Sequence, residues 1–271
     1  MSFARDVLHI PLPSNRLWRE RIRSLTAVVN PKPLFIFGNQ KSGTTAIAGL
    51  LASATGKTVT LDFAGAEEPY LSNLLRGQTP LEKFVRRNAW AFSADIIKEP
   101  SLTFVAHGLM DHFDSARAVF VVRNPYDNIR SILVRQRLRG DLRELPARAR
   151  LNPTWRKILS GGDLGTAGGH YVDVLAKRWV HAIEIFQAQP KRFITVRYED
   201  FNKAKVDEIS RLASALNLPV VADVTALTEI DYQRRDLKAV PPEKFFGDNY
   251  ARISMACEKV AQSLGYEPGQ G

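Results

Sequence analysis

The sequence predicts an α/β fold with a parallel sheet. Short apolar runs alternate with helical patterns along the chain, which is typical of strands and helices that follow one another around such a sheet. The sequence contains no internal repeat and no low-complexity segment. The chain has 271 residues, of which 45% are hydrophobic and 24% charged, so it is long and apolar enough to bury a core. We expect a single domain over residues 1–271, with an N-terminal extension at residues 1–30.

Five apolar runs are predicted to be strands, and the amphipathic patterns between them are predicted to be helices. The strands are residues 34–37, 59–61, 94–97, 118–122 and 193–196. The helices are residues 44–55, 80–88, 102–113, 172–186 and 251–264, together with one that begins at Pro125. Gly56 and Gly265 directly follow two of these helices, where a left-handed residue commonly ends a helix.

The chain is basic, with 38 Lys and Arg against 28 Asp and Glu and a net charge of +10. This excess fits nucleic acid, an acidic membrane surface, a multiply phosphorylated small molecule or simple solubility, and composition does not choose among them. No apolar run reaches the roughly 18 residues of a membrane span. Residues 1–30 lack the apolar stretch of a secretory signal. Cys257 is the only cysteine, which excludes an intramolecular disulfide and a zinc site of clustered cysteines and favours a reducing, cytoplasmic location.

Residues 135–170 differ from the rest of the chain. A glycine-rich stretch follows six closely spaced arginines: Arg135, Arg137, Arg139, Arg143, Arg148 and Arg150. The segment is predicted to be a mobile lid or an acceptor loop, and a solvated basic helix with a loose linker is an equally open interpretation. The arginines have no interleaved aromatic residues and match no known binding motif, which argues against a nucleic-acid partner.

A glycine-containing segment, GNQKSGTT at residues 38–45, lies between the first predicted strand and the first predicted helix. At such a junction, the free N–H groups of the first helical turn and the positive end of the helix dipole attract an anion. We expect an anion to be bound by Lys41, Ser42, Gly43, Thr44 and Thr45. A Walker A loop has its lysine directly after the second glycine, whereas here the lysine precedes it by two positions. The strand at residues 118–122 ends in Arg123 instead of the Asp that would hold magnesium, so we predict an anion site without a metal ion.

A second motif, RNPYDNIRS at residues 123–131, begins at the end of the strand at residues 118–122. Asn124 suits a helix N-cap, Pro125 the first helical position and Asp127 the acid of a capping box. Arg123 is therefore predicted at the carboxyl edge of the sheet, where open α/β sheets bind ligands. An arginine can hold an anion with two hydrogen bonds and a serine can donate one, so Arg123 and Ser131 are predicted to bind one anionic group.

Together these segments resemble the signature elements of the sulfotransferases that use 3′-phosphoadenosine 5′-phosphosulfate (PAPS). The family's K-x-G-T-T element is matched by Lys41, Gly43, Thr44 and Thr45, and its R-x-P-x-x-x-x-x-S element by Arg123, Pro125 and Ser131. Residues 196–201 (VRYEDF) resemble a third, strand-end segment. The resemblance implies a three-layer α/β/α sandwich related to P-loop NTPases, with PAPS as donor, 3′-phosphoadenosine 5′-phosphate (PAP) as product and no metal. It also implies that the first element holds the 5′-phosphosulfate and the second the 3′-phosphate.

The sequence departs from the family at the adenine. Many members have a Trp after G-T-T that stacks on this base, and here the residue is Ala46. Tyr198, or Phe245 with Phe246, is predicted to replace it. The family's C-terminal basic segment for the 3′-phosphate has no clear match, and Arg234, Arg235 and Lys244 are the candidates.

The resemblance implies in-line transfer of a sulfuryl group to an acceptor hydroxyl, with Lys41 at the leaving-group oxygen and Lys98 at the transferring group. Members similar to steroid and phenol sulfotransferases carry K-T-H with a histidine base, but this chain reads Lys98-Glu99-Pro100. Carbohydrate-modifying and many bacterial members use a glutamate after the second strand, and residues 67–71 (EEPYL) resemble that segment. The candidate bases, in order, are Glu68, Glu67 and Glu99; the start of an exposed helix or turn is the alternative interpretation of the first two. His170 is the one histidine that we keep as an acceptor-site candidate.

The alternative function is that of a P-loop kinase for a small molecule, which would bind ATP with magnesium. The position of the lysine and the missing acid after residues 118–122 argue against it. We expect the acceptor to be a small molecule or a carbohydrate with a hydroxyl. These motifs do not specify which one, nor do they specify an oligomeric state.

Overall fold

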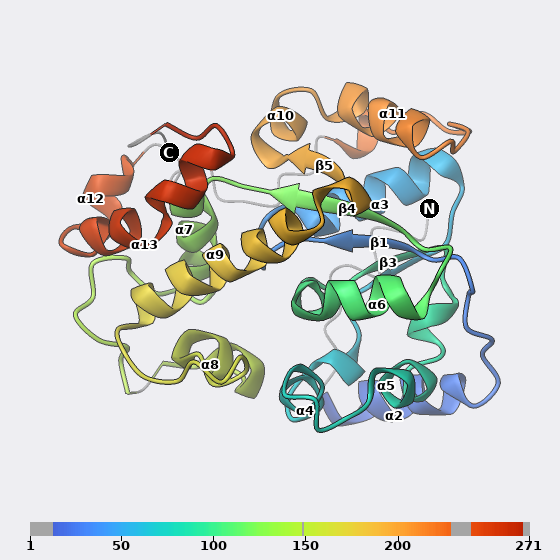
Figure 1. Ribbon diagram of the computed structural model, residues 1–271, viewed down its shortest axis with the longest axis horizontal. Coiled ribbons are helices and arrows are strands. Elements are labelled where there is room, and N and C mark those ends of the chain that lie inside the picture. Colours follow the sequence, from blue (N-terminus) through green and yellow to red (C-terminus); the bar gives the residue numbers. More distant parts are fainter. Residues whose placement is uncertain (1–12, 148, 229–239, 268–271) are drawn as a thin grey trace.

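A parallel sheet forms the centre of the molecule (Figure 1). The computed structural model describes residues 13–147, 149–228 and 240–267. The five strands, in the order β2-β3-β1-β4-β5 across the sheet, are β1 (Leu34–Phe37), β2 (Val59–Leu61), β3 (Ile96–Lys98), β4 (Arg117–Val122) and β5 (Ile194–Arg197). In the central register, Leu34 of β1 lies between Ile96 of β3 and Arg117 of β4. The predicted fold class is confirmed.

Around the strands the chain forms α-helices and short 3-10 helices. In chain order the α-helices are α2 (Pro13–Ser24), α3 (Thr44–Thr55), α4 (Tyr70–Leu75), α5 (Leu81–Arg87), α6 (Ala106–His112), α7 (Pro125–Arg135), α8 (Pro153–Ser160), α9 (Tyr171–Ala188), α10 (Tyr198–Lys203), α11 (Lys205–Ala215), α12 (Pro242–Phe246) and α13 (Asn249–Ser263). Short 3-10 helices are η1 (Ala64–Ala66), η2 (Ala91–Ser93), η3 (Pro100–Val105), η4 (Pro190–Arg192) and η5 (Thr225–Leu227).

The alternation of side chains along the strands gives the sheet two apolar faces. In β1, Leu34 and Ile36 pack in one cluster with residues of α3 and α11, whereas Phe35 and Phe37 pack in a second cluster with residues of α6, α7, α9 and α13. Successive side chains of a strand point to opposite faces, so a strand that is apolar at every position is covered on both sides. The two clusters make the molecule a layered α/β/α arrangement.

Helix α3 follows the predicted boundaries. It runs over residues 44–55, and Gly56 ends it with a left-handed φ of 65° and an N–H that donates to the Ala52 carbonyl. Helix α7 is capped as expected, because the side chain of Asn124 accepts hydrogen bonds from the N–H groups of Tyr126 and Asp127. The N–H of Asn124 donates to Glu199 at 2.8 Å, which is the bond that a capping-box acid at Asp127 would have accepted.

Two predicted elements differ in the structure. The helix predicted over residues 102–113 is η3 followed by α6, because the Thr103 hydroxyl bonds both the N–H and the carbonyl of Gly38 and draws this segment toward the first strand. The third strand begins at Ile96 instead of residue 94, since the carboxylate of Asp95 accepts from the N–H and hydroxyl of Thr58 before the strand starts. Helices α2, α4, α8, α10, α11 and α12 had no counterpart in the sequence prediction.

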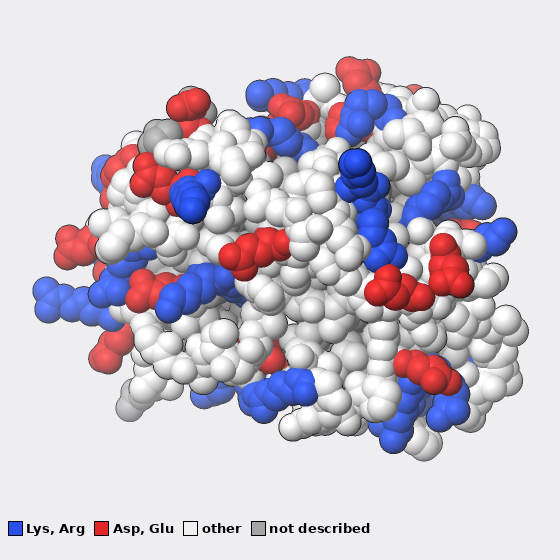
Figure 2. Space-filling view, in the orientation of Figure 1, with Lys and Arg blue, Asp and Glu red and all other residues white. Residues whose placement is uncertain are grey.

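On the face seen in Figure 2, Lys and Arg side chains lie beside Asp and Glu side chains, so positive and negative charges are mixed there. None of the helices in the described ranges is long and apolar enough to cross a membrane.

Candidate active site

A cleft of about 490 Å³ opens at the carboxyl edge of the sheet. In Figure 1 the strand arrows point to this edge, toward the side on which α7 and α8 are drawn. Its lining comes from the segments that follow all five strands, and from α2 and α8. The charged residues in the lining are Arg16, Lys41, Asp62, Glu67, Lys98, Glu99, Arg123, Arg135 and Lys205. Six basic side chains against three acidic ones make this a cleft suited to an anion.

Two glycines permit the backbone path of the loop at residues 38–45. Gly38 has a φ of 146° and Gly43 a φ of 94°. A Cβ on Gly38 would lie 2.6 Å from the Val121 carbonyl oxygen, and one on Gly43 would lie 2.2 Å from the ring of Tyr198. Lys41 also has a positive φ, 67°, which is unusual for a residue with a side chain. The loop is therefore held in one tight conformation against β4 and the start of α10.

Asn128 holds this loop from the first turn of α7. Its side-chain oxygen accepts from Asn39 Nδ2 at 2.9 Å, and its Nδ2 donates to the Gln40 carbonyl at 2.9 Å and to Ser42 Oγ at 3.0 Å. Asn128 is fully buried. The sequence reasoning did not identify it, although it lies within the RNPYDNIRS motif. The Ser42 hydroxyl accepts this hydrogen bond from Asn128, and Ser42 is not among the residues that line the cleft.

The start of α3 offers backbone donors to an anion. Gly43 at its N-cap provides no side-chain acceptor for them. The first N–H groups of a helix need an acceptor, and Lys41, Thr44 and Thr45 line the cleft around them. These residues fit a phosphate or a phosphosulfate.

Arg123 connects the second motif to the first. Its Nη1 donates to the Lys41 carbonyl at 2.7 Å, its guanidinium lies over the Tyr198 ring at 4.3 Å, and its own carbonyl accepts from Trp179 Nε1 at 2.9 Å. Arg123 is only 5% exposed yet lines the cleft. Ser131 is buried on α7 and is outside the cleft lining. The structure thus brings Lys41, Arg123 and Tyr198 together.

Burial and neighbouring cations act on Lys41. They lower its pKa from 10.5 to about 8, chiefly through desolvation and then through the charges of Arg135, Arg123 and Lys98. A lysine whose charged form is disfavoured in this way gains strongly from an anion placed beside it. An anion bound beside Lys41 would therefore favour the charged form of this lysine.

The carboxylates lie on the opposite side of the cleft from Tyr198. Asp62, which the sequence reasoning did not identify, follows β2 and pairs with Lys98 Nζ at 2.6 Å. Glu99 accepts from the Ser101 N–H at 3.0 Å, and burial, followed by the nearby charge of Asp62, raises its pKa well above the usual range. Burial also raises the pKa of Glu67.

Glu67 and Glu68 point differently. Glu67 lines the cleft. Glu68 is outside the lining: its Oε1 accepts from the Ser72 hydroxyl at 2.6 Å on α4, and its N–H donates to Thr154 Oγ1 at 3.1 Å on α8. Of the two neighbouring glutamates, only the first therefore faces the space in which a substrate would lie.

The sequence matches the sulfotransferase domain family over residues 31–240, which is most of the chain. This chain belongs to that family. A comparison with curated proteins found no match.

Solved sulfotransferase structures share the fold. Sulfotransferase STF9 from Mycobacterium avium has a TM-score of 0.54 at 14% identity, with 94% of this chain and 83% of that chain covered. The sulfotransferase domain from the curacin biosynthetic pathway has a TM-score of 0.50 at 16% identity, with coverages of 89% and 99%. Sulfotransferase STF1 from Mycobacterium tuberculosis H37Rv has a TM-score of 0.50 at 14% identity, with coverages of 90% and 81%.

Other residues singled out in the sequence of this sulfotransferase lie away from the cleft. His170 caps α9, accepting from the Val172 N–H. Phe246 is fully buried, and Phe245 packs against the guanidinium of Arg130. Lys244 is exposed on α12. Arg234 and Arg235 lie outside the described residues.

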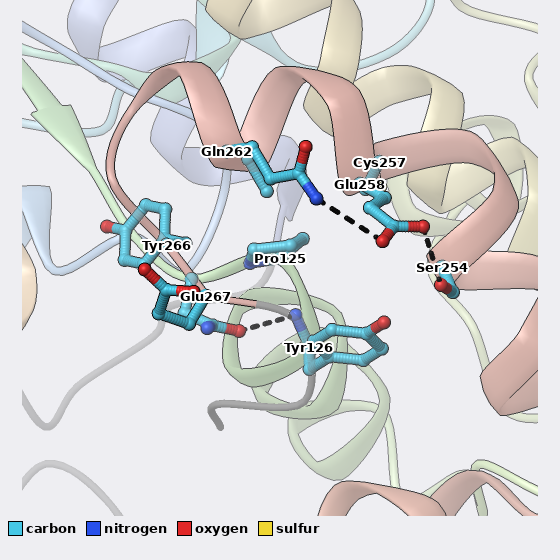
Figure 3. A pocket seen from close by; sticks show the side chains of 10 residues that line it. Pro125, Tyr126, Ser254, Cys257, Glu258, Gln262, Tyr266 and Glu267 are labelled. Atoms are coloured by element: carbon cyan, nitrogen blue, oxygen red, sulfur yellow. Dashed lines mark hydrogen bonds between the residues drawn. The ribbon is translucent and has the colours of Figure 1, made fainter.

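The third motif has one member in the cleft and one that supports the fold. Tyr198 lines the cleft, whereas the two carboxylate oxygens of Glu199 accept from the Asn124 N–H at 2.8 Å and the Tyr266 hydroxyl at 2.9 Å. Beside this contact, Figure 3 shows a small cavity between the start of α7 and the end of α13, with Pro125, Tyr126 and Tyr266 in its wall. Its volume of about 20 Å³ suits a single water molecule, so it is no second substrate site.

The segment at residues 135–170 contributes a wall of the cleft. Asn152, Thr154, Trp155 and Ile158, at the start and along one side of α8, are in the lining, together with Arg135 at the end of α7. Arg16, from the N-terminal residues 1–30, is also in the lining, and its Nε pairs with Glu20 at 2.8 Å. Residues 1–30 and residues 135–170, which the sequence distinguishes from the rest of the chain, thus each contribute to the cleft.

Proposed function

We propose that this sulfotransferase moves a sulfuryl group from PAPS to an acceptor hydroxyl. The observation that carries the proposal is the meeting of two anion-binding motifs in one cleft. Lys41 and Arg123 are 82 positions apart in the sequence, and Arg123 donates to the Lys41 carbonyl at 2.7 Å. A nucleotide with phosphates at both its 5′ and 3′ positions needs two such cations a short distance apart.

The donor would lie along the loop and Tyr198. The uncapped start of α3, with Lys41, Ser42, Gly43, Thr44 and Thr45, would hold the 5′-phosphosulfate, Ser42 acting through the loop backbone. Arg123 would hold the 3′-phosphate, whereas Ser131, which the motif also assigns to this group, lies outside the cleft lining. Tyr198 lines the cleft beside Ala46, where many family members have a tryptophan, so its ring is the candidate platform for the adenine. A base that stacks on an aromatic ring gains about 1–3 kcal/mol.

The chemistry would be an in-line displacement. A bond forms between the acceptor oxygen and sulfur while the bond between sulfur and the 5′-phosphate oxygen breaks, and the acceptor proton passes to a carboxylate. Lys41 and Lys98 would stabilise the charge that develops on the leaving phosphate and the transferring group. No step requires a metal ion.

Glu67 is our preferred base. It faces the cleft, and burial raises its pKa toward the range in which a carboxylate can accept a proton near neutral pH. Glu68 was the first choice from the sequence, but its hydrogen bond with Ser72 directs it to α4. Glu99 also lines the cleft, but its raised pKa favours the protonated form, which would have to lose its proton before it could act as a base.

The acceptor side suits a polar molecule with a hydroxyl, such as a carbohydrate. Asn152 and Thr154 offer hydrogen-bonding groups, and Trp155 offers a flat apolar surface in the same wall. This combination allows a sugar ring to stack on the indole while its hydroxyls bond to the polar side chains.

Isothermal titration calorimetry with PAP in a magnesium-free buffer tests the donor. We expect 1:1 binding that EDTA does not weaken, and markedly weaker binding of ATP. Binding of ATP that requires magnesium and equals or exceeds that of PAP would favour a kinase instead. Transfer of radiolabelled sulfate from PAPS to carbohydrate and phenolic acceptors then tests the reaction.

A further inference from the structure

A buried ion pair lies behind the cleft. Arg178 of α9 pairs with Asp163 at 2.5 Å, and their side chains are 1% and 0% exposed. Neither residue is in the cleft lining, and neither was singled out by the sequence motifs. A fully buried pair costs desolvation free energy that its attraction often only balances, so stability alone does not account for it.

From this pair a chain of hydrogen bonds runs to the donor loop. Arg178 Nε donates to Gln40 Oε1 at 2.9 Å, and the Phe104 ring packs against the guanidinium at 4.3 Å. Gln40 directly precedes Lys41. Its Nε2 donates to Ser101 Oγ at 3.1 Å, and the N–H of the same serine donates to Glu99. The orientation of Arg178 thus bears on both Lys41 and Glu99.

At its other end the pair holds the acceptor wall. Asp163 follows α8 by three residues, after Gly161 has ended the helix with a φ of 72°. Arg76 donates to the carbonyl of Gly162 in the same turn. Because α8 supplies Trp155 and Ile158 to the cleft, a displacement of this turn would move the acceptor wall.

The hydrogen-bonding groups of this pair do not all have partners. Among the described residues, Asp163 Oδ1 and Arg178 Nη2 are buried without a hydrogen-bond partner. Such atoms cost free energy, and the pair would tolerate that cost if its role were to hold two parts of the enzyme in register.

We propose that Arg178 is a positioning residue that couples donor binding at the phosphate loop to the α8 wall on the acceptor side, through Gln40 and Asp163. The inference rests on the proposed function, because the donor is the ligand whose binding the loop would transmit. Occupation of the loop fixes Gln40, Gln40 fixes the guanidinium, and the guanidinium fixes Asp163 and the end of α8. The donor would therefore order the acceptor site before the acceptor binds.

Hydrogen–deuterium exchange with and without saturating PAP tests the coupling without an acceptor. In the wild-type enzyme we expect PAP to slow exchange in residues 38–47 and also, by about threefold or more, in residues 152–163. Gln40→Met and Asp163→Leu cut the two ends of the chain, because neither new side chain can accept a hydrogen bond from Arg178. Both variants should keep PAP-dependent slowing in residues 38–47 and lose it in residues 152–163.

Two further variants separate coupling from a structural effect. Arg139→Ala removes the exposed Arg139–Asp141 pair from the same 135–170 segment and should leave both slowings intact. If Asp163→Leu is too unstable to purify, the double variant Asp163→Leu, Arg178→Met removes both buried charges and serves in its place. A purely structural role would raise exchange in residues 152–163 equally with and without PAP.

The outcomes distinguish this inference from the proposed function. Failure of the wild-type enzyme to bind PAP would overturn both. PAP binding that leaves residues 152–163 unchanged in the wild-type enzyme, or that slows them equally in Gln40→Met, would overturn the coupling alone.

Discussion

The two sides of the cleft are built in different ways. The donor side consists of backbone groups and cations from two sequence motifs, each of which is one continuous stretch of the chain. Glycines and Asn128 fix the loop of the first motif. The acceptor side is assembled from side chains of α2, α8 and the segments after β2 and β3. A site made of backbone tolerates few changes in its own sequence, whereas a site made of separate side chains can change one residue at a time.

The charges differ in the same way. On the donor side Lys41 is surrounded by other cations, which together with burial lower its pKa to about 8. On the acceptor side Lys98 is paired with Asp62, and Arg16 with Glu20. On the donor side Lys41 therefore lies among like charges, whereas Lys98 and Arg16 each lie beside an acidic side chain.

The largest effect is expected for Lys41→Ala, which removes the central cation of the donor side. Loss of one charged group that stabilises a transition state costs about 10²–10³ in kcat, and we expect the upper end of this range, because Lys41 also contributes to binding of the phosphosulfate. Single-turnover transfer from PAPS measures it. Lys57→Ala, which changes a lysine paired with Asp95 at 3.6 Å on the surface, is the control and should retain full activity. Retention of more than a tenth of the wild-type rate by Lys41→Ala would break the assignment of the donor side.

The next effect tests the acceptor side and compares two adjacent residues. Glu67→Gln should lower kcat by about 10²-fold, because general-base catalysis contributes about 10²–10⁴. Glu68→Gln should change kcat by less than about threefold, since a glutamine can still accept the hydrogen bond from Ser72 and the residue is outside the cleft. Steady-state kinetics with any accepted hydroxyl substrate measures both. The reverse order of effects would restore Glu68 as the base.

The loop at residues 38–45 and the helix after it were predictable because their information is local. Lys41, Gly43 and the threonines lie together in eight residues, and the helix that begins at Thr44 has the predicted boundaries. The parallel sheet followed from strands that are apolar on both faces, which are recognisable as continuous apolar runs. Their placement brought Lys41 and Arg123 to one edge without any knowledge of tertiary contacts.

The acceptor side was less predictable because it depends on contacts between distant segments. Arg16 comes from a helix that had no counterpart in the sequence prediction, and Asn128 looks like any polar residue on a helix until its loop partners are known. The choice between Glu67 and Glu68 depends on a turn after η1, where side chains follow no fixed period. Helices and strands reveal the direction of a side chain through their periods, and an irregular turn does not.

A smaller effect is expected for Gly43→Ala, which tests whether the backbone of the donor side is as constrained as it looks. The new Cβ would lie 2.2 Å from the Tyr198 ring at a φ of 94°, and such strain costs about 1–3 kcal/mol. Affinity for PAP, measured by calorimetry, should fall about tenfold or more. Gly49→Ala is the matched control within α3, where a Cβ meets nothing within 4 Å. It should leave PAP affinity unchanged and stabilise the helix by about 0.5–1 kcal/mol. Equal affinities in the two variants would contradict a backbone-defined donor site.

The smallest effect concerns the charge on the donor side. Because the pKa of Lys41 is lowered to about 8, the free enzyme loses this cation as the pH rises through that value, and PAP affinity should decline by up to about tenfold per pH unit above it. Deprotonation of Glu99 at raised pH adds a negative charge and acts in the same direction, so the measurement is made in a Glu99→Gln background. After burial, the charge of Arg135 is the largest cause of the lowered pKa. In that background Arg135→Ala should therefore move the decline to higher pH, and affinity above about pH 8 should fall less steeply than with Arg135 present. Calorimetry with PAP between about pH 6 and 9 gives both curves. If they have the same midpoint, Arg135 does not act on Lys41, and the lowered pKa of Lys41 comes from burial, Arg123 and Lys98.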